Sequence, residues 1–268
     1  MIKIEQLFIY PVKGCRGVSV DKIQVTPMGL VGDREYALLL DGNRINQNQV
    51  PVLVKLSAVY TDGNTLELSF PGKDSFSIST DEPGSISTLS MLGEKISIIK
   101  ANKISDWLSD ALGGQFELVK MEKPIDWNIP LEEFASIHKQ KQSKFVDAAP
   151  LLLTNIGSLA ELNSRLAIAI PMDRFRANVV VSGLSAFEED TFSEFRFPDA
   201  NLTRIAVCER CIVTTTDQET GERGKEPLRT LSKYRKRENH YAGGILFGMY
   251  LHAENAGLLS VGDSLQVK

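Results

Sequence analysis

The sequence predicts a mainly β protein with a few helices, closed into barrels. Strand-like runs dominate the first hundred residues, turn signals such as Asp62-Gly63-Asn64 separate them, and few segments space their apolar residues at helical intervals. Because so many short strands must dispose of their edges, closure into barrels is the expected solution. With 268 residues, of which 43% are hydrophobic, the chain can bury the core of one large or two modest domains.

The first part of the chain is expected to form antiparallel β structure followed by one helix. Residues 1–10 alternate in polarity as a strand does, and further strand-like runs cover 37–40, 52–60, 66–70 and 96–100. The segment from Ile104 to Leu112 spaces its apolar residues at helical intervals, and Gly113-Gly114 after it is typical of a left-handed cap. We therefore predict the first helix over this segment.

The second part is expected to hold two more helices and several strands. Ser158, with Glu161 three residues later, has the pattern of a capping box and predicts a helix to about Leu166. Pro227 predicts another helix over 228–236, with proline at its first position. Strands are predicted over 179–183 and at the end of the chain, whereas 122–146 has little periodicity and is expected to be a linker or loop.

Composition and charge exclude several classes of partner. The formal net charge is −4, from 34 acidic and 30 basic residues that are well mixed, so no nucleic acid duplex is expected as a partner. No apolar stretch approaches the roughly 20 residues that a membrane helix needs, and the first ten residues lack the pattern of a secretory signal. Three unevenly spaced cysteines cannot form a disulfide framework. We therefore expect a cytoplasmic protein with reduced cysteines and no membrane partner.

The motif Cys208-Glu209-Arg210-Cys211 is the most informative feature for function. A structural zinc site needs four ligands, and only Cys15 and three scattered histidines remain to complete one. A dithiol redox motif normally uses a helix N-terminus, whereas the run 212–217 is β-prone. Two interpretations stay open beside these: cysteines that pack as small hydrophobic residues, or one cysteine as the single protein ligand to a metal whose other ligands arrive with a cofactor.

A metal-carrying organic cofactor usually has a phosphate tail, so its site needs cations beside flexible backbone. Lys13 precedes Gly14, and Arg34 comes just after a turn glycine. Arg176 offers a bidentate guanidinium, and Asn178 beside it has the donors and acceptors that a heterocycle requires. A lone lysine or arginine, however, is more often a solvated surface charge or part of a modest surface ion pair.

Other cofactors and hydrolytic chemistry leave no comparable pattern. No G-x-G-x-x-G follows a strand, and no G-x-x-x-x-G-K-[ST] occurs. The three histidines, His138, His240 and His252, lack metal-ligand spacing, and no Ser/His/Asp order can be assigned. The acidic run Glu188-Glu189-Asp190 is given no catalytic role. The functional prediction therefore centres on Cys211.

Seven motifs, in the same order along nearly the whole chain, carry a resemblance to a known family. They are Tyr10-Pro11-Val12-Lys13, Gly32-Asp33-Arg34, 174–178, 186–190, Cys208 to Cys211 with Thr214-Thr215, Glu226-Pro227-Leu228 and Val261-Gly262-Asp263. With these motifs the chain resembles the MOSC-domain family (molybdenum cofactor sulfurase C-terminal type), in the branch of the mitochondrial amidoxime reducing component and bacterial YcbX-like reductases. The resemblance implies an N-terminal MOSC-type β-barrel domain over 1–121, a linker over 122–146 and a MOSC β-barrel domain over 147–268, with a molybdenum–molybdopterin cofactor between them.

The resemblance also implies roles for individual residues. Cys211 matches the molybdenum ligand and catalytic residue, and Asp217 is expected to orient substrate or relay protons. The implied cofactor-binding positions are Lys13, Gly14, Arg34, Ala149, Arg176, Asn178 and Cys208. Relative to the family, the resemblance implies three departures: Gly14, where serine is frequent, the pair Ala148-Ala149, where hydroxyl residues are common, and Asn48, where arginine is usual.

The implied activity is the reduction of N-hydroxylated bases or amidoximes, small N-oxygenated molecules, with two electrons and two protons and release of water. Because the chain has no flavin or nicotinamide fingerprint, a separate electron-donor protein is expected, either a flavoprotein or an iron–sulfur or haem carrier. The alternative is a molybdenum cofactor carrier or a sulfur-transfer protein with a persulfide on Cys211. Pyridoxal phosphate is not expected, because the chain has no room for a desulfurase domain. A third interpretation is a β-rich binding protein that has lost the cofactor.

Overall fold

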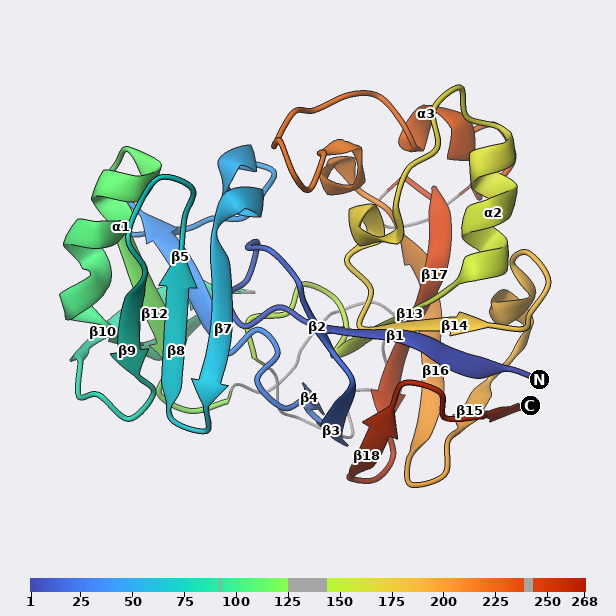
Figure 1. Ribbon diagram of the computed structural model, residues 1–268, viewed down its shortest axis with the longest axis horizontal. Coiled ribbons are helices and arrows are strands. Elements are labelled where there is room, and N and C mark those ends of the chain that lie inside the picture. The colour runs from blue at the N-terminus through green and yellow to red at the C-terminus, as the bar shows by residue number, and fades with distance from the viewer. Residues whose placement is uncertain (92, 125–143, 239–242) are drawn as a thin grey trace.

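The computed structural model describes residues 1–91, 93–124, 144–238 and 243–268. It confirms a mainly β protein with a few helices, arranged as two β bodies side by side along the long axis (Figure 1). The smaller body holds β5 to β12 with α1, and the larger holds β13 to β19 with α2, α3 and β1. The expected linker 122–146 lies mostly outside the described residues, so its bounds and the domain limits remain a prediction.

The larger body is built on an eight-stranded sheet, in the order β19-β15-β16-β17-β13-β14-β1-β2. Neighbours in this sheet are antiparallel except for β13 and β14, which are parallel. The strands are β1 (Lys3–Ile9), β2 (Val18–Val20), β13 (Leu151–Asn155), β14 (Val179–Ser182), β15 (Glu194–Arg196), β16 (Asn201–Glu209), β17 (Leu246–Ala253) and β19 (Gln266–Val267). A small sheet and two helices complete this body: β3 (Lys22–Thr26), β4 (Gly29–Leu30), β18 (Gly257–Ser260), α2 (Ile156–Ser164) and α3 (Leu228–Leu231).

The smaller body contains a five-stranded sheet, in the order β10-β11-β12-β5-β6, and a three-stranded sheet, β7-β8-β9. Its strands are β5 (Tyr36–Leu40), β6 (Asn43–Arg44), β7 (Ser57–Asp62), β8 (Thr65–Ser69), β9 (Phe76–Ser79), β10 (Ser85–Met91), β11 (Glu94–Lys100) and β12 (Phe116–Met121). Helix α1 (Ser105–Leu112) packs on β12 and buries Leu108. This body therefore has its own hydrophobic core.

The N-terminal strand connects the two bodies. β1 pairs with β14 in the larger sheet, from Lys3 opposite Ser182 to Leu7 opposite Val179. A few residues later, the backbone N–H of Lys13 donates to the carbonyl oxygen of Tyr36 on β5, at 2.8 Å. The segment 10–13 therefore lies where the two bodies meet.

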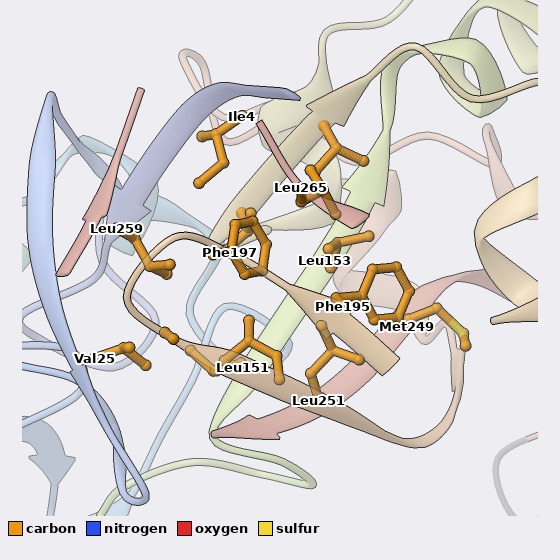
Figure 2. Close-up of a cluster of buried hydrophobic side chains, with 14 of the residues drawn as sticks. Ile4, Val25, Leu151, Leu153, Phe195, Phe197, Met249, Leu251, Leu259 and Leu265 are labelled. Atoms are coloured by element: carbon orange, nitrogen blue, oxygen red, sulfur yellow. The ribbon is translucent and has the colours of Figure 1, made fainter. Parts of the chain in front are cut away.

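The largest cluster of buried hydrophobic side chains lies in the larger body (Figure 2). Alternate residues of neighbouring strands supply it, such as Leu151 and Leu153 on β13 and Met249 and Leu251 on β17. This alternation follows from the opposite directions of successive side chains along a strand. Each body therefore has its own hydrophobic core, and the loops between the bodies are anchored to both.

Several local predictions are confirmed. The strand expected in the first ten residues is β1, and the runs 37–40, 66–70 and 96–100 fall on β5, β8 and β11. The first predicted helix is α1, and Gly113 ends it with a φ of 77° in the left-handed region. Glycine reaches this conformation without the clash that a Cβ causes, which is why the signal is readable in the sequence.

The capping box predicted at Ser158 is wrong. Helix α2 begins earlier, at Ile156, and its N-cap is Asn155, whose side chain accepts a hydrogen bond from the N–H of Gly157 at 2.9 Å. Ser158 is buried instead, and its hydroxyl donates to Glu189 at 2.6 Å. A long-range contact thus decides the role of this serine.

Three other boundaries also differ from the predictions. Residues 51–55 form a 3-10 helix, so β7 begins only at Ser57. Helix α3 ends at Leu231, and Pro227 is its N-cap and not its first residue. The β-prone run after Cys211 forms a 3-10 helix over Ile212–Thr215. Strand propensity is weak compared with the tertiary context, and it fails here.

A β-bulge in β17 lies opposite the cysteine motif. Val207 pairs with Met249 and Glu209 with Leu246, so two residues of β17 face the single residue Cys208. Gly248 in this bulge has a φ of +79°, and a Cβ there would lie 2.7 Å from the carbonyl oxygen of Leu153. The bulge therefore requires glycine at this position.

Replacing Gly248 by alanine is expected to lower the free energy of unfolding by about 3 kcal/mol, because left-handed strain and a backbone clash add together. Gly42→Ala is the matched control, since Gly42 has a φ of +75° but nothing within 4 Å of its added Cβ. The control should cost only about 1 kcal/mol. Urea denaturation measures both, and equal losses would show that the close approach to Leu153 does not matter.

Candidate functional site

A cavity of about 410 Å³ is lined by residues from both bodies. Its lining comprises Lys13, Gly14, Arg34, Asn46, Gln47, Asn48, Val146, Asp147, Ala148, Ala149, Leu152, Phe175, Arg176, Asn178, Glu209, Arg210, Cys211, Ile212, Val213 and Tyr250. Seven predicted site residues are among them: Lys13, Gly14, Arg34, Ala149, Arg176, Asn178 and Cys211. Cys208 and Asp217 are not part of this lining. A second hollow, of about 360 Å³ over Glu194 and Arg196, contains no predicted site residue.

Cys211 presents an exposed thiol to this cavity. It follows the end of β16 and is the N-cap residue of the 3-10 helix Ile212–Thr215. The hydroxyl of Thr214 donates to the Cys211 carbonyl oxygen at 3.0 Å, which fixes the backbone just after the thiol. A 3-10 helix of four residues thus does follow Cys211, and the prediction of a β-prone run without a helix is wrong here.

Cys208 has the opposite environment. It is fully buried among hydrophobic residues that include Phe175 and Phe247. Burial raises the pKa of the Cys208 thiol, although Arg210 acts in the opposite direction. Nη1 of Arg210 lies 2.8 Å from the Cys208 sulfur. The packing interpretation therefore suits Cys208, whereas the exposed Cys211 is the cysteine open to chemistry.

Lys13 is buried at the cavity wall and pairs with Asp147. The Lys13 ammonium lies 2.6 Å from Oδ1 of Asp147, and Nη1 of Arg44 lies 3.6 Å from the same oxygen. Burial lowers the pKa of Lys13 to about 8, and Asp147 opposes that effect. Asp147 was not predicted as a site residue, because it follows the region expected to be a linker and carries no motif of its own.

The low pKa of Lys13 predicts a pH-dependent anion affinity. Lys13 is charged below about pH 8 and neutral above it, so the cavity loses a cation as the pH rises. The dissociation constant for sulfate, which stays a dianion throughout, should rise about tenfold between pH 7 and pH 10. Calorimetric titration measures this rise. Lys13→Arg, which keeps its charge, should remove most of it, and an equal rise in that variant would contradict the assignment.

Asn178 lines the cavity, but protein groups already use its amide. Its Oδ1 accepts from the Leu152 N–H at 3.1 Å and from Arg34 at 3.3 Å. Its Nδ2 donates to Asp33 at 3.1 Å, and Asp33 also forms an ion pair with Arg34. Asn178 therefore orients Arg34 in this structure, and buried Asp33 is a second orienting residue that the sequence analysis did not single out.

Arg176 and Asp217 lie in adjoining but different surroundings. Nη1 of Arg176 donates to the carbonyl oxygen of Cys15 at 2.7 Å and to Gln218 at 3.3 Å. Asp217 instead pairs with Arg174 at 2.7 Å and accepts the N–H of Thr220 at 2.9 Å. The N–H of Thr220 helps to hold the pKa of Asp217 below its usual value. Asp217 thus shapes the turn after the cysteine motif.

Gly14, where the resemblance implies that serine is frequent, has a backbone conformation that suits glycine. Its φ is +83°, and a Cβ there would lie 3.3 Å from the Cα of Asn46. The Gly14 carbonyl accepts from Gln47 at 2.8 Å, which ties the loop to the smaller body. Ala148, Ala149 and Asn48, the other positions where the resemblance implies different residues, also line the cavity.

Family models match both parts of the chain. A model described as the MOSC N-terminal beta barrel domain matches residues 1–115, and one described as the MOSC domain matches residues 140–266. None of the helices in the described part of the chain is long and apolar enough to cross a membrane.

Similar proteins extend over almost the whole chain. Mitochondrial amidoxime reducing component 2 of Bos taurus is 35% identical over 97% of this chain and 81% of its own length. Mitochondrial amidoxime-reducing component 1 of Homo sapiens has the same identity and the same coverage. The solved YUAD protein of Bacillus subtilis aligns over 100% of this chain and 96% of its own, but its TM-score of 0.44 and 14% identity are too low to bear on the fold. The chain therefore belongs to the MOSC-domain family, in the branch of the amidoxime reducing components.

Proposed function

We propose that this protein is a molybdenum-cofactor-dependent reductase of amidoximes and other N-hydroxylated bases, with electrons from a separate protein. One observation carries the proposal. The exposed thiol of Cys211 lines the same cavity as four basic side chains, those of Lys13, Arg34, Arg176 and Arg210. A soft ligand beside an anion-binding wall is what a molybdenum–pterin with a phosphate tail requires.

The residues in the cavity fit this group. Cys211 supplies one thiolate ligand, and the dithiolene sulfurs of the pterin would complete a sulfur-rich environment for the metal. Nε of Arg210 is buried without a hydrogen-bond partner among the described residues, so the wall still has a donor to offer. Lys13, Arg34 and Arg176 would hold the anionic tail by charge-assisted hydrogen bonds.

Bound at Cys211, the cofactor would supply the two-electron removal of oxygen from an N–O bond. The role of the chain's own groups would be to bind the cofactor and to orient it. The basic wall would hold the cofactor, and Ile212 and Val213 next to the thiol give one side of the cavity an apolar surface. Two protons enter with the two electrons, and the products are the reduced base and water.

The names of the relatives support the substrate class. The similar proteins from cattle and humans are called amidoxime reducing components, and each aligns over 97% of this chain. Their names also place them in mitochondria, so the expected cytoplasmic location of this chain remains a prediction.

Purification from a host that makes the molybdenum cofactor tests the proposal. About one molybdenum per chain is expected by elemental analysis, together with a releasable pterin. With a reduced viologen as electron donor, the protein should convert an aryl amidoxime to the amidine. Absence of molybdenum from protein made in such a host would refute the proposal.

The exposure of Cys211 favours a second candidate, a carrier of the cofactor or of sulfur. An accessible thiolate can take the outer sulfur of a donor protein's persulfide, which is released as a thiol, and can then pass that sulfur to another enzyme. Mass spectrometry that finds a persulfide on Cys211, in protein unable to reduce any amidoxime or hydroxylamine, would select this second candidate. Persulfide-free protein with reductase activity would exclude it.

A further inference from the structure

Two arginines of the cavity wall share one buried aromatic ring. The guanidinium carbons of Arg34 and Arg176 lie over the ring of Tyr10, at 4.9 Å and 4.2 Å from its centroid. Tyr10 itself is only 3% exposed and is not among the residues that line the cavity. The aromatic face attracts both cations, and this attraction strengthens where water is excluded.

Every polar group of Tyr10 is bonded to one of these arginines or to a residue next to one. The Tyr10 N–H donates to Oδ1 of Asp33 at 2.7 Å, and its carbonyl accepts from the Arg34 N–H at 2.8 Å. Its hydroxyl donates to the carbonyl oxygen of Ala177 at 3.1 Å. Tyr10 thus ties a loop that follows β4 to the segment before β14.

The backbone of both arginines is strained. Arg34 has a φ of 51° and Arg176 a φ of 54°, in the left-handed region that side chains other than glycine rarely occupy. Such residues persist only where surrounding contacts hold them. Tyr10 makes contacts of this kind with both arginines, because both guanidinium groups lie over its ring. Its carbonyl also accepts from the Arg34 N–H, and its hydroxyl donates to the backbone of Ala177, next to Arg176.

Two cations held near each other repel, and Tyr10 opposes that repulsion without carrying a charge. Burial lowers the pKa of Arg176, and the positive charge of Arg34 lowers it further. The neutral ring of Tyr10 offsets part of this repulsion through its electron-rich face. Burial also raises the pKa of the Tyr10 hydroxyl to about 12, so the ring stays neutral and serves through its π face and its hydroxyl.

We propose that Tyr10 is a positioning residue that holds Arg34 and Arg176 together as one receptor for a dianion, the tail of the bound cofactor. The identity of the dianion rests on the function proposed above, whereas the contacts among Tyr10, Arg34 and Arg176 do not depend on that function. Loss of the ring should separate the two guanidinium groups and weaken anion binding, even though Tyr10 lies outside the cavity lining.

Sulfate affinity of protein made without the cofactor tests this directly, with Tyr10→Leu and Tyr10→Phe as the variants. Tyr10→Leu removes the ring and should raise the sulfate dissociation constant about tenfold. Tyr10→Phe keeps the ring and should stay within about threefold of the unmodified protein. Phe195→Leu removes another fully buried ring, in the core of the larger body, and should lower the Tm without changing sulfate affinity.

The outcomes separate this inference from the proposed function. If Tyr10→Leu folds and binds sulfate as tightly as the unmodified protein, the inference is overturned, whatever the molybdenum content. If sulfate binding weakens as expected while the unmodified protein takes up no molybdenum, the positioning role stands and the proposed function fails. Should Tyr10→Leu not fold, Tyr10→Met fills the space with a flexible apolar chain and is judged by the same affinity.

Discussion

Replacing Cys211 by serine is expected to lower amidoxime reduction at least about 100-fold and to remove most of the bound molybdenum. Serine keeps the size of the side chain but replaces a soft thiolate by a hard hydroxyl of much higher pKa. Cys211 is exposed at the cavity, so the change should leave the fold intact. Elemental analysis, cofactor release and the rate of amidine formation measure the three parts of the result.

Cys208→Ser is the matched control for this variant. Cys208 is buried and its sulfur contacts Arg210, so a serine hydroxyl can still accept that guanidinium's hydrogen bond. This control should keep its molybdenum and most of its activity, at some cost in stability. A Cys211→Ser protein with full activity, or a Cys208→Ser protein that alone loses the metal, would overturn the assignment of the ligand.

The fold was predictable where local sequence and tertiary packing agree. Alternating polarity in the first ten residues predicts β1, because the strand buries its apolar side chains. Gly113 marks the end of α1, because glycine reaches the left-handed region without strain. Ser158 has an equally clear local pattern, yet its hydroxyl bonds to Glu189, which no local pattern reveals. The strand predicted after Cys211 is wrong for a similar reason, because β-branched residues favour a strand only where a partner strand is available.

The candidate site shows a similar division. Lys13, Arg34 and Arg176 were found because each stands in a motif, and the structure brings all three to one cavity. Their partners were not found. Asp147 pairs with Lys13 although it comes from the other half of the chain. Tyr10 acts through a ring whose two neighbours, Arg34 and Arg176, come from distant segments. Such pairings depend on how the segment 10–13 that follows β1 lies between the two bodies, which the residues alone do not reveal.

The second large effect concerns stability and Glu189. Glu189→Ala is expected to lower the free energy of unfolding by about 3 kcal/mol, because two buried donors lose their acceptor. The carboxylate accepts from Ser158 at 2.6 Å and from Asn155 at 3.0 Å, and Asn155 is the N-cap of α2. The substitution therefore leaves the start of this helix without its anchor. Urea denaturation at constant pH measures the loss.

The pH dependence of that loss provides a sharper test. Burial raises the pKa of Glu189 above its usual value, although bonds from Ser158 and Asn155 oppose the rise. The folded state therefore holds this proton more tightly than the unfolded chain, so the stability that Glu189 contributes falls as pH rises through the raised pKa. The difference in the free energy of unfolding between the unmodified protein and Glu189→Ala should therefore be larger at pH 5 than at pH 8.

Glu188→Ala is the matched control, because Glu188 is the neighbouring residue and its side chain is only half-buried. This control should lower the free energy of unfolding by less than about 1 kcal/mol at either pH. Equal costs for the two glutamates would show that the buried carboxylate does not anchor α2.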